Sequence, residues 1–458
     1  MKPIKQEVFR AYDIRGIVDK DFDPEWVEML GKACGTYFRK NGHKRAIVGH
    51  DCRHSSPIYQ QSMIKGLLAT GVDVIYLNMV ATPLFYFAIK FLNARAGVMI
   101  TASHNPKEFN GFKIWAGEST IHTDEIQKVY QIMRAQDFLI SERLQGLATE
   151  LDIVPAYLDY LTREGRFAQP VKVVVDGGNG AAGEVCATVL EKLGAEVVKL
   201  YCEPDGDFPN HHPDPTVMDN LKDLRETILK EKAHLGIGLD GDGDRIGVLD
   251  EQGNIIYGDR LLAIYAREVL KKNPGATIIG EVKCSHLLYK DIEKHGGRPI
   301  MWKTGHSLIK AKMKEEKALL AGEMSGHMFF ADRYFGFDDA IYAAKRLLEI
   351  VSQNPDKPIS TYLADWPPTF STPEIRMECP EAIKFKVIEK ALEYFRQRYE
   401  IIDIDGVRVV FADGWGLLRA SNTQPVLVLR FEAESKKRLT EIRALIEEPL
   451  KNWIQELS

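Results

Sequence analysis

The stretch VKVVVDGGNG, residues 171–180, sets the expectation for the whole fold. It is a run of β-branched residues that ends in a small, polar turn, and a segment with helical periodicity follows it. A second apolar run, GAEVVKL (194–200), comes next. A β-branched run, a helix and another apolar run in this order predict a βαβ unit with parallel strands.

The same unit occurs twice more in the chain. RAIVGHD (45–51) is followed by a helical stretch and GVDVIYL (71–77), and ATIIGEV (276–282) is followed by a helical stretch and GRPIMWK (297–303). The copies lie about a hundred residues or more apart, which is far longer than any solenoid repeat. Each copy is therefore expected to be a domain of its own.

We predict an α/β fold of three related α/β layered domains in series plus a C-terminal α+β domain. The tail differs because the proline-rich WPPTFSTPEI (366–375), a predicted hinge, precedes a helix, alternating strands and a last amphipathic helix from Lys436. The four domains are expected to pack around shared space. The predicted boundaries are 1–150 for the first α/β domain, 151–254 for the second, 255–366 for the third and 367–458 for the α+β domain.

Composition excludes several classes of protein. The chain has 458 residues, of which 45% are hydrophobic and 27% charged, and these values exclude disordered and fibrous proteins. A net charge of −5 argues against nucleic acid as a partner. The six cysteines form no C-x-x-C pair, so no disulfide or zinc site is expected. No long apolar window and no signal-like start are present, so we expect a soluble, cytoplasmic protein without a membrane partner.

The segment GIGLDGDGDRIGVLD (236–250) carries the sharpest chemical signal. Residues two apart in an extended loop project the same way, so the carboxylates of Asp240, Asp242 and Asp244 should converge, and such oxygen ligands favour Mg²⁺ or Ca²⁺. An EF-hand is disfavoured because Arg245 stands where that motif requires glycine and because the flanks predict strands. We predict a catalytic divalent-metal loop rather than a solvated acidic turn, with Arg245 as a phosphate clamp.

A second cluster, AGVMITASHNPKEFNGFKIW (96–115), is an apolar strand that runs into a polar loop around Ser103. The loop lacks the G-x-S-x-G elbow of a hydrolase nucleophile. A serine that carries a phosphoryl group needs donors and cations, and His104, Asn105 and Lys113 supply them nearby. An ordinary capping serine is the alternative. Asn110 and Gly111 are expected to turn the chain into the next strand.

Three other loops have a functional and a structural interpretation. GGNGAAG (177–183) contains G-x-G-x-x-G, but a tight strand-to-helix turn is favoured over a dinucleotide site. GEMSGH (322–327) offers an acid, a hydroxyl and an imidazole for sugar hydroxyls, or is a polar turn. RASNTQP (419–425) can wrap a phosphate, or is a solvated hairpin loop. The pair His211 and His212 lies in a proline-rich connection and is interpreted as structural.

Five segments together resemble the α-D-phosphohexomutase family: TASHNP, NGFK, DGDGDR, GEMSGH and RASNT, in that order. The resemblance spans essentially the whole chain, from FRAYDIRG (9–16) to VLRFEA (428–433). It implies four domains around a central active-site cleft, three of them related, in agreement with the repeat found above. It also implies reversible phosphoryl transfer between O1 and O6 of a hexose phosphate, through a phosphoserine and a hexose 1,6-bisphosphate that serves as intermediate and activator.

The resemblance also assigns roles to residues. Ser103 looks like the phosphoserine, and Ser103, Asp240, Asp242 and Asp244 look like the Mg²⁺ ligands. The expected catalytic residues are Ser103, Arg245, Lys113 and His104. The expected substrate-binding residues are Tyr12, Arg15, Lys283, His306, Glu323, Ser325, His327, Arg419, Ser421, Asn422 and Thr423.

Loop details narrow the substrate. GEMSGH with RASNT is similar to the bacterial bifunctional phosphomannomutase/phosphoglucomutases, whereas phosphoglucosamine mutases typically carry GEQSGH and a glycine where Asn422 stands. Mannose and glucose phosphates are the expected small-molecule partners, and no obligate protein partner is implied. A phosphoglucosamine mutase, a metal-dependent sugar phosphatase that uses the same site, and a sugar-phosphate-binding regulator without turnover remain the alternatives.

Overall fold

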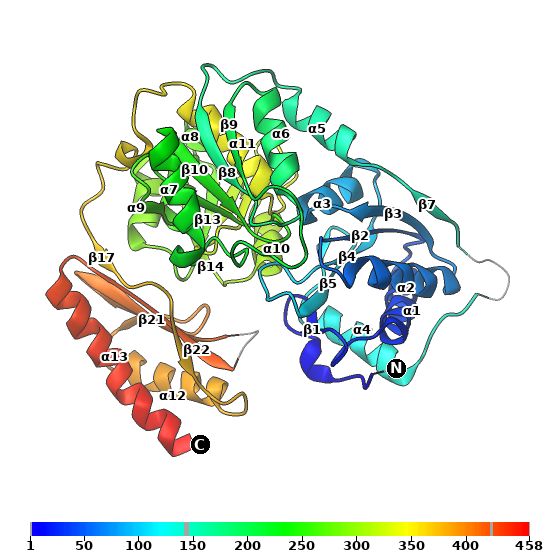
Figure 1. Ribbon diagram of the computed structural model, residues 1–458. Coiled ribbons are helices and arrows are strands. Elements are labelled where there is room, and N and C mark those ends of the chain that lie inside the picture. The colour runs from blue at the N-terminus through cyan, green and yellow to red at the C-terminus, as the bar shows by residue number, and fades with distance from the viewer. Residues whose placement is uncertain (1, 142–145, 422–424, 458) are drawn as a thin grey trace.

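The computed structural model describes residues 2–141, 146–421 and 425–457. Four β-sheets follow one another along this part of the chain (Figure 1). The first sheet contains β1 (Ile14–Ile17), β2 (Arg45–His50), β3 (Asp73–Met79), β4 (Ala96–Ile100), β5 (Phe109–Ala116), β6 (Ser119–Thr120) and β7 (Ala148–Glu150). The second contains β8 (Lys172–Asp176), β9 (Glu196–Leu200), β10 (Leu235–Leu239), β11 (Ile246–Leu249) and β12 (Ile255–Ile256). The third contains β13 (Thr277–Glu281), β14 (Arg298–Trp302), β15 (Leu320–Gly322) and β16 (Met328–Phe330). The fourth contains β17 (Phe370–Ser371), β18 (Ile375–Glu378), β19 (Glu400–Ile402), β20 (Val407–Phe411), β21 (Gly414–Ala420) and β22 (Val426–Ala433).

Helices cover these sheets. They are α1 (Pro24–Lys40), α2 (Ser56–Ala69), α3 (Thr82–Phe91), α4 (Asp124–Ala135), α5 (Val154–Thr162), α6 (Gly183–Lys192), α7 (Lys222–Glu231), α8 (Gly258–Lys272), α9 (His286–Lys294), α10 (His306–Glu316), α11 (Ala340–Val351), α12 (Lys384–Arg396) and α13 (Lys436–Leu457). Short 3₁₀ turns lie at Gln6–Val8, Met218–Leu221 and Ile359–Thr361. In the described part of the chain, no helix combines the length and the apolar character needed to cross a membrane.

The first three sheets share one topology, which confirms the predicted repeat. Their central orders are β5-β4-β2-β3, β11-β10-β8-β9 and β16-β15-β13-β14. In each, the last three strands of that order are parallel and the first is antiparallel. The predicted βαβ units are the parallel pairs β2–β3, β8–β9 and β13–β14 with α2, α6 and α9 between them. The fourth sheet is entirely antiparallel and completes the predicted fold class.

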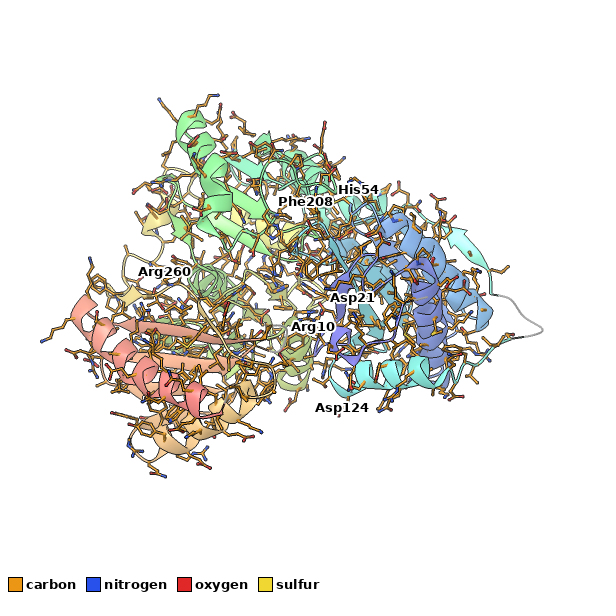
Figure 2. All side chains as sticks on the ribbon, turned by 60° about the horizontal axis from the view of Figure 1, so that its bottom comes forward. Arg10, Asp21, His54, Asp124, Phe208 and Arg260 are labelled. Carbon is orange, nitrogen blue, oxygen red and sulfur yellow. The ribbon has the colours of Figure 1, made fainter. Side chains whose placement is uncertain are left out.

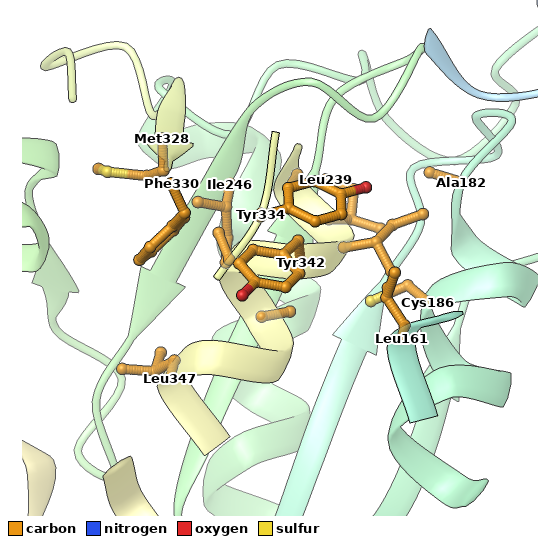
Figure 3. Packing of buried hydrophobic residues seen from close by; sticks show 14 of the residues in the cluster. Leu161, Ala182, Cys186, Leu239, Ile246, Met328, Phe330, Tyr334, Tyr342 and Leu347 are labelled. Atoms are coloured by element: carbon orange, nitrogen blue, oxygen red, sulfur yellow. The ribbon is translucent and has the colours of Figure 1, made fainter. Parts of the chain in front are cut away.

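One hydrophobic core joins the three α/β units. It contains residues of α3 from the first, α6 and β10 from the second, and α8 and α11 from the third. Figure 3 shows Leu161, Cys186 and Leu239 of the second unit packed against Tyr334 and Tyr342 of the third. The C-terminal unit has its own core under α12 and α13, and a smaller cluster of Val282, Trp415 and Leu417 connects it to the third unit. The fourth unit thus has a core of its own and docks on the third unit.

Two local features differ from the sequence-based expectation. Asn110 and Gly111 lie inside β5 and do not form a turn. The glycine is needed there because a Cβ atom would lie 2.4 Å from the carbonyl oxygen of Ile14 on the paired strand β1. In addition, β12 still pairs with β11, so the second sheet extends two residues past the boundary proposed at 254. The exact domain boundaries stay predictions.

The glycine-rich segment 177–182 forms the tight turn that leads β8 into α6, as predicted. Gly178 and Asn179 have φ values of 51° and 56°, and a Cβ atom at Gly180 would lie 2.8 Å from the carbonyl oxygen of Gly241. The turn therefore packs against the aspartate loop. His211 lies 3.0 Å from Asp176 at the end of β8, in keeping with a structural role for the histidine pair.

Candidate active site

The predicted site residues follow the carboxyl ends of equivalent parallel strands. Ser103 comes after β4, Asp240 directly after β10 and Glu323 directly after β15. These three strands occupy the same place in their sheets. Ligands of open α/β sheets bind at this edge, outside the carboxyl ends of the strands. The repeated fold therefore directs one loop from each α/β unit toward a common region.

Ser103 lies on a buried turn with an unusual backbone conformation. Its φ is 50° and it is 1% exposed. The hydroxyl donates a hydrogen bond to Oδ2 of Asp240 over 2.6 Å and lies 3.1 Å from Nδ1 of His104. Burial, together with Arg245 and Arg15, lowers the pKa of His104 well below its usual value. The structure thus joins the predicted serine of the first unit directly to the predicted aspartates of the second.

The three aspartates occupy the turn between the antiparallel strands β10 and β11. Gly243 adopts a φ of 74°, and the amides of Asp244 and Arg245 both donate to Oδ1 of Asp240 over 3.1 Å. One carboxylate oxygen from each of Asp240, Asp242 and Asp244 lies within 4.8 Å of the others. Because strands rather than helices flank the turn, the EF-hand interpretation is wrong.

The donor set of this turn fits a divalent cation. All three side chains are fully buried, and Oδ1 of Asp242 and Oδ1 of Asp244 have no hydrogen-bond partner among the described residues. Burial, with Asp244 and Asp242 nearby, raises the pKa of Asp240 well above its usual range. Buried carboxylate oxygens without donors are costly unless a cation offsets them. The loop could therefore hold the predicted metal.

Lys113 on β5 supplies one positive charge to the same carboxylates. Its Nζ donates to Oδ2 of Asp242 over 2.7 Å and also contacts Asp244, and the side chain is 2% exposed. Burial alone would lower the pKa of Lys113, but Asp242 and Asp244 hold it above its ordinary value. Thr82, at the start of α3, donates its hydroxyl to the same Asp242 oxygen over 2.6 Å. The first unit thus contributes both the serine and two donors that fix the metal loop.

Arg245 connects the aspartate loop to the third unit. Its Nε lies 3.0 Å from Nε2 of His327 and 4.0 Å from Oδ2 of Asp240. The other ring nitrogen of His327 faces Asp338, at 3.3 Å from Oδ2. His306, at the start of α10, stacks on His327 with ring centroids 5.6 Å apart. The predicted residues Arg245, His306 and His327 therefore form one cluster.

Glu323 is buried in the loop predicted to bind sugar. Its Oε1 accepts a hydrogen bond from the amide of Gly305 over 2.7 Å, next to His306. Burial raises the pKa of Glu323. Ser325 lies in the same loop and is partly exposed. The hydroxyl of Tyr12 donates to the carbonyl oxygen of Thr304 over 2.8 Å, which brings the N-terminal segment to this loop.

Two further predicted cations have carboxylate partners. Lys283 follows β13, and its Nζ donates to Glu374 over 3.1 Å. Arg15 donates to Asp13 over 2.7 Å and to Oδ1 of Asn105 over 2.6 Å, so it braces the serine loop.

The predicted Arg419, at the end of β21, is linked to the third unit through Asp405. Its Nε donates to Oδ2 of Asp405 over 3.0 Å, and the same oxygen accepts from the amide of Thr304 over 3.1 Å. The carbonyl oxygen of Ser421 accepts from Lys384 over 2.6 Å. The predicted Asn422 and Thr423 lie outside the described residues.

Sequence reasoning missed several residues of this region. Asp51 and Arg53 lie under the serine loop, Asp338 faces His327, and Asp405 pairs with Arg419. The signal for the first pair was present: Asp51 directly follows the predicted parallel strand in RAIVGHD, Arg53 comes two residues later, and charged residues in such a place lie at the ligand edge of the sheet. Nothing in the sequence marks Asp338 or Asp405, because only the tertiary fold brings them to their partners.

Comparison with known families agrees with this arrangement. Four families match in series: phosphoglucomutase/phosphomannomutase alpha/beta/alpha domain I at residues 6–139, domain II at 155–253, domain III at 257–370, and the C-terminal domain at 374–448. The chain belongs to the phosphoglucomutase/phosphomannomutase family. The four matches follow the order of the four units described above.

Individual relatives cover nearly the whole chain. It is 48% identical over 97% of its length to a phosphomannomutase/phosphoglucomutase of Pseudomonas aeruginosa, of which 95% is covered. It is 45% identical over 97% of its length to a phosphoglucomutase of Neisseria gonorrhoeae, of which 96% is covered. A crystal structure of a phosphoglucomutase/phosphomannomutase family protein from Burkholderia thailandensis aligns with a TM-score of 0.91 at 40% identity, covering 98% of both chains.

Proposed function

We propose that this member of the phosphoglucomutase/phosphomannomutase family interconverts the 1- and 6-phosphates of mannose and glucose. The observation that carries the proposal is the hydroxyl of Ser103, buried at 2.6 Å from Asp240, whose neighbour Arg245 reaches His327 of the third unit. A single site that holds a nucleophilic hydroxyl, a carboxylate cluster and several cations suits phosphoryl transfer. The names of relatives at 45–48% identity support the same activity and do not favour a phosphoglucosamine mutase.

In the proposed reaction the phosphoryl group moves from Oγ of Ser103 to a free hydroxyl of the sugar phosphate. The Oγ–P bond breaks, a P–O bond to the sugar forms, and the proton of the sugar hydroxyl ends on Oγ. His104, 3.1 Å from Oγ, is the group through which that proton can pass. The resulting hexose 1,6-bisphosphate turns over within the site and returns its other phosphate to Ser103.

The residues that would hold Mg²⁺ are Ser103, Asp240, Asp242 and Asp244. When bound, the cation would offset negative charge on the transferring group. The Oδ1 atoms of Asp242 and Asp244, which have no hydrogen-bond partner among the described residues, support this choice of site. Lys113 and Arg245 keep the carboxylates oriented and offset part of their charge.

The remaining predicted residues would bind and orient the substrate. Glu323 can accept hydrogen bonds from two neighbouring sugar hydroxyls, and Arg419 with Ser421 would bind the phosphate that is not reacting. The C-terminal unit has its own hydrophobic core and meets the third unit through polar contacts, such as those of Arg408 with the carbonyl oxygens of Val282 and Cys284. A movement of this unit as one body would close it over the substrate and exclude water. Water exclusion distinguishes a mutase from a phosphatase, because water would otherwise accept the phosphoryl group.

A coupled assay tests the proposal. The purified protein, with Mg²⁺ and a trace of glucose 1,6-bisphosphate, is given glucose 1-phosphate or mannose 1-phosphate, and formation of the 6-phosphate is followed. We expect both substrates to turn over, without stoichiometric release of inorganic phosphate. Release of phosphate in step with loss of substrate would establish the phosphatase, and a clear preference for glucosamine 1-phosphate would establish the phosphoglucosamine mutase.

The six free cysteines agree with an enzyme of the reducing cytoplasm.

A further inference from the structure

The structure assigns a role to Arg53: we propose that it is the positioning residue that sets the backbone of the serine loop, and hence the place of the reacting Ser103 oxygen. The inference rests on the proposed function, because it concerns how that function's nucleophile is held. Arg53 follows β2, is 1% exposed, and was not singled out by any motif. It does not contact the reacting atoms.

All five N–H groups of the Arg53 guanidinium have acceptors. Nη2 donates to the carbonyl oxygens of Ser103 over 2.8 Å and Asn105 over 2.6 Å. Nη1 donates to those of Pro106 over 2.7 Å and Phe109 over 3.0 Å. The fifth donor, Nε, is 3.1 Å from Oδ2 of Asp51. An arginine side chain has five donors in a rigid planar fork, so this one fixes three carbonyl oxygens of the serine loop and that of Phe109 at the start of β5.

The loop needs such a clamp because its conformation is strained. Ser103 has a φ of 50°, which a non-glycine residue adopts only when its surroundings hold it. The clamp acts on the backbone and leaves the side chain directed at Asp240. The carbonyl oxygen of Ser103 also packs against Gly241 of the second unit, where a Cβ atom would lie 2.5 Å from it. A shift of this carbonyl would therefore move the serine relative to the aspartate loop.

Two elements hold Arg53 itself. Asp51 accepts from the backbone amide of Arg53 over 3.0 Å and from the hydroxyl of Ser56 over 2.7 Å, so the carboxylate is fixed from several sides. Above the guanidinium lies the ring of Phe208 from the second unit, 5.2 Å from its carbon. Figure 2 shows His54 and Phe208 close together where the first and second units meet. Arg53 thus couples the serine loop to the contact between the two units.

A shift in the position of the Ser103 oxygen should lower the turnover number more than it weakens substrate binding. A nucleophile misplaced by about 1 Å can lose on the order of a hundredfold in rate. Groups that bind the substrate would be unchanged, so KM should stay constant while kcat falls. A residue that only stabilises the fold would instead lower the melting temperature and leave the rate constant of the folded protein alone.

The test compares Arg53→Lys with wild type and with Arg346→Lys. Lysine keeps the charge beside Asp51 but has three donors, too few for five acceptors. Arg346 is a matched control because it is 4% exposed and bonded to Asp332, a residue outside the site. We expect kcat with glucose 1-phosphate to fall about a hundredfold in Arg53→Lys, with KM within about threefold of wild type. The Arg346→Lys control should keep kcat within about threefold, even if its melting temperature falls equally.

A second readout isolates the serine. Dephosphorylated enzyme is incubated with glucose 1,6-bisphosphate, and the gain of a phosphoryl group is followed by intact mass. Arg53→Lys should gain it at least tenfold more slowly than the control. If Arg53→Lys yields no folded protein, Asp51→Asn keeps the volume and frees the guanidinium from its anchor, and it should lower kcat about tenfold at constant KM.

The outcomes separate the two hypotheses. An inactive wild type contradicts the proposed function itself. An active wild type with Arg53→Lys, or Asp51→Asn in its place, as fast as the Arg346→Lys control contradicts the role of Arg53 alone. A rise in KM with constant kcat would also overturn it, because it would mean that Arg53 acts on substrate binding.

Discussion

Replacing Lys113 with methionine should make the stability of the aspartate loop depend more strongly on a bound Mg²⁺. Lys113 and the carboxylates of Asp242 and Asp244 are all buried, and Arg245 is the nearest other cation, 4.0 Å from Asp240. Three carboxylates face two cations in the wild type. The variant leaves one cation, while methionine keeps most of the side-chain volume.

The expected magnitude follows from the burial. Removing one partner of a buried ion pair costs about 3 to 5 kcal/mol. One kcal/mol corresponds to roughly 2 to 4 °C for a domain of about 150 to 250 residues and to less for a larger cooperative unit. In EDTA the melting temperature of Lys113→Met should therefore fall by several degrees. Saturating Mg²⁺ at about a hundredfold over its Kd returns about 2.7 kcal/mol, so most of the loss should be recovered.

Differential scanning fluorimetry with and without Mg²⁺ measures this directly. Lys345→Met is the matched control, since Lys345 is also 2% exposed and contacts two carboxylates, Glu164 and Glu349, away from the loop. Mg²⁺ should raise the melting temperature of Lys113→Met more than that of wild type, whereas Lys345→Met should respond as wild type does. An equal Mg²⁺ response in all three proteins would refute the assignment of the metal to this loop.

Three other predictions concern the phosphate, pH and the sugar. Arg419→Ala should raise KM for both sugar phosphates about tenfold to a hundredfold, the equivalent of a charge-assisted contact of about 1.5 to 3 kcal/mol; unchanged kinetics would place that loop elsewhere. The charge of Lys283 lowers the pKa of Glu374 from its usual 4.5 to about 2, and this effect exceeds the opposing effect of burial. The ion pair therefore stabilises the fold fully above pH 4.5, and the stabilisation is lost as the pH falls toward 2. Urea unfolding should accordingly find Glu374→Gln less stable than wild type at pH 7, by about 1 kcal/mol because the partly exposed pair is screened by solvent, and the difference should disappear as the pH falls through 2. A difference that does not change with pH would contradict the ion pair. Finally, kcat/KM for mannose and glucose 1-phosphate should agree within about tenfold, because Glu323 can bind the hydroxyls that both sugars share and does not contact O2. Glucosamine 1-phosphate should have a lower kcat/KM, because the cations of the site repel its ammonium group. A larger difference between the two neutral sugars would mean that a buried group hydrogen-bonds to O2 of one of them.

The sequence predicted the parts of this structure that depend on local pattern. Alternating aspartates and glycines placed three carboxylates together because side-chain direction in a short turn is a local property. The repeated order of strand, helix and strand predicted three similar sheets because a helical crossover between two strands favours parallel pairing. Asn110 and Gly111 were misread for the opposite reason: their composition is that of a turn, but the close approach of β1 requires the glycine.

What the sequence could not reveal are contacts made to the backbone. The partners of Arg53 are four carbonyl oxygens about fifty residues away, and carbonyls have no signature in the sequence. The carboxylate of Asp405 reaches the amide of Thr304 only because the C-terminal sheet docks on the third unit. Its contact with Arg419 is made within the C-terminal unit, by the pairing of β20 with β21. Such residues become visible when the fold is known.

The central claim is that Ser103 carries the phosphoryl group between the two ends of the sugar. Intact-mass measurement of the enzyme after treatment with glucose 1,6-bisphosphate, and again after addition of glucose 6-phosphate, tests it most directly. The wild type should gain about 80 Da, one phosphoryl group, mapped to Ser103, and lose it as glucose 1,6-bisphosphate forms. Ser103→Ala should gain none, keep its melting temperature and have no measurable mutase turnover. A Ser103→Ala variant that still interconverts the sugar phosphates, or a phosphoryl group mapped to another residue, would contradict the account.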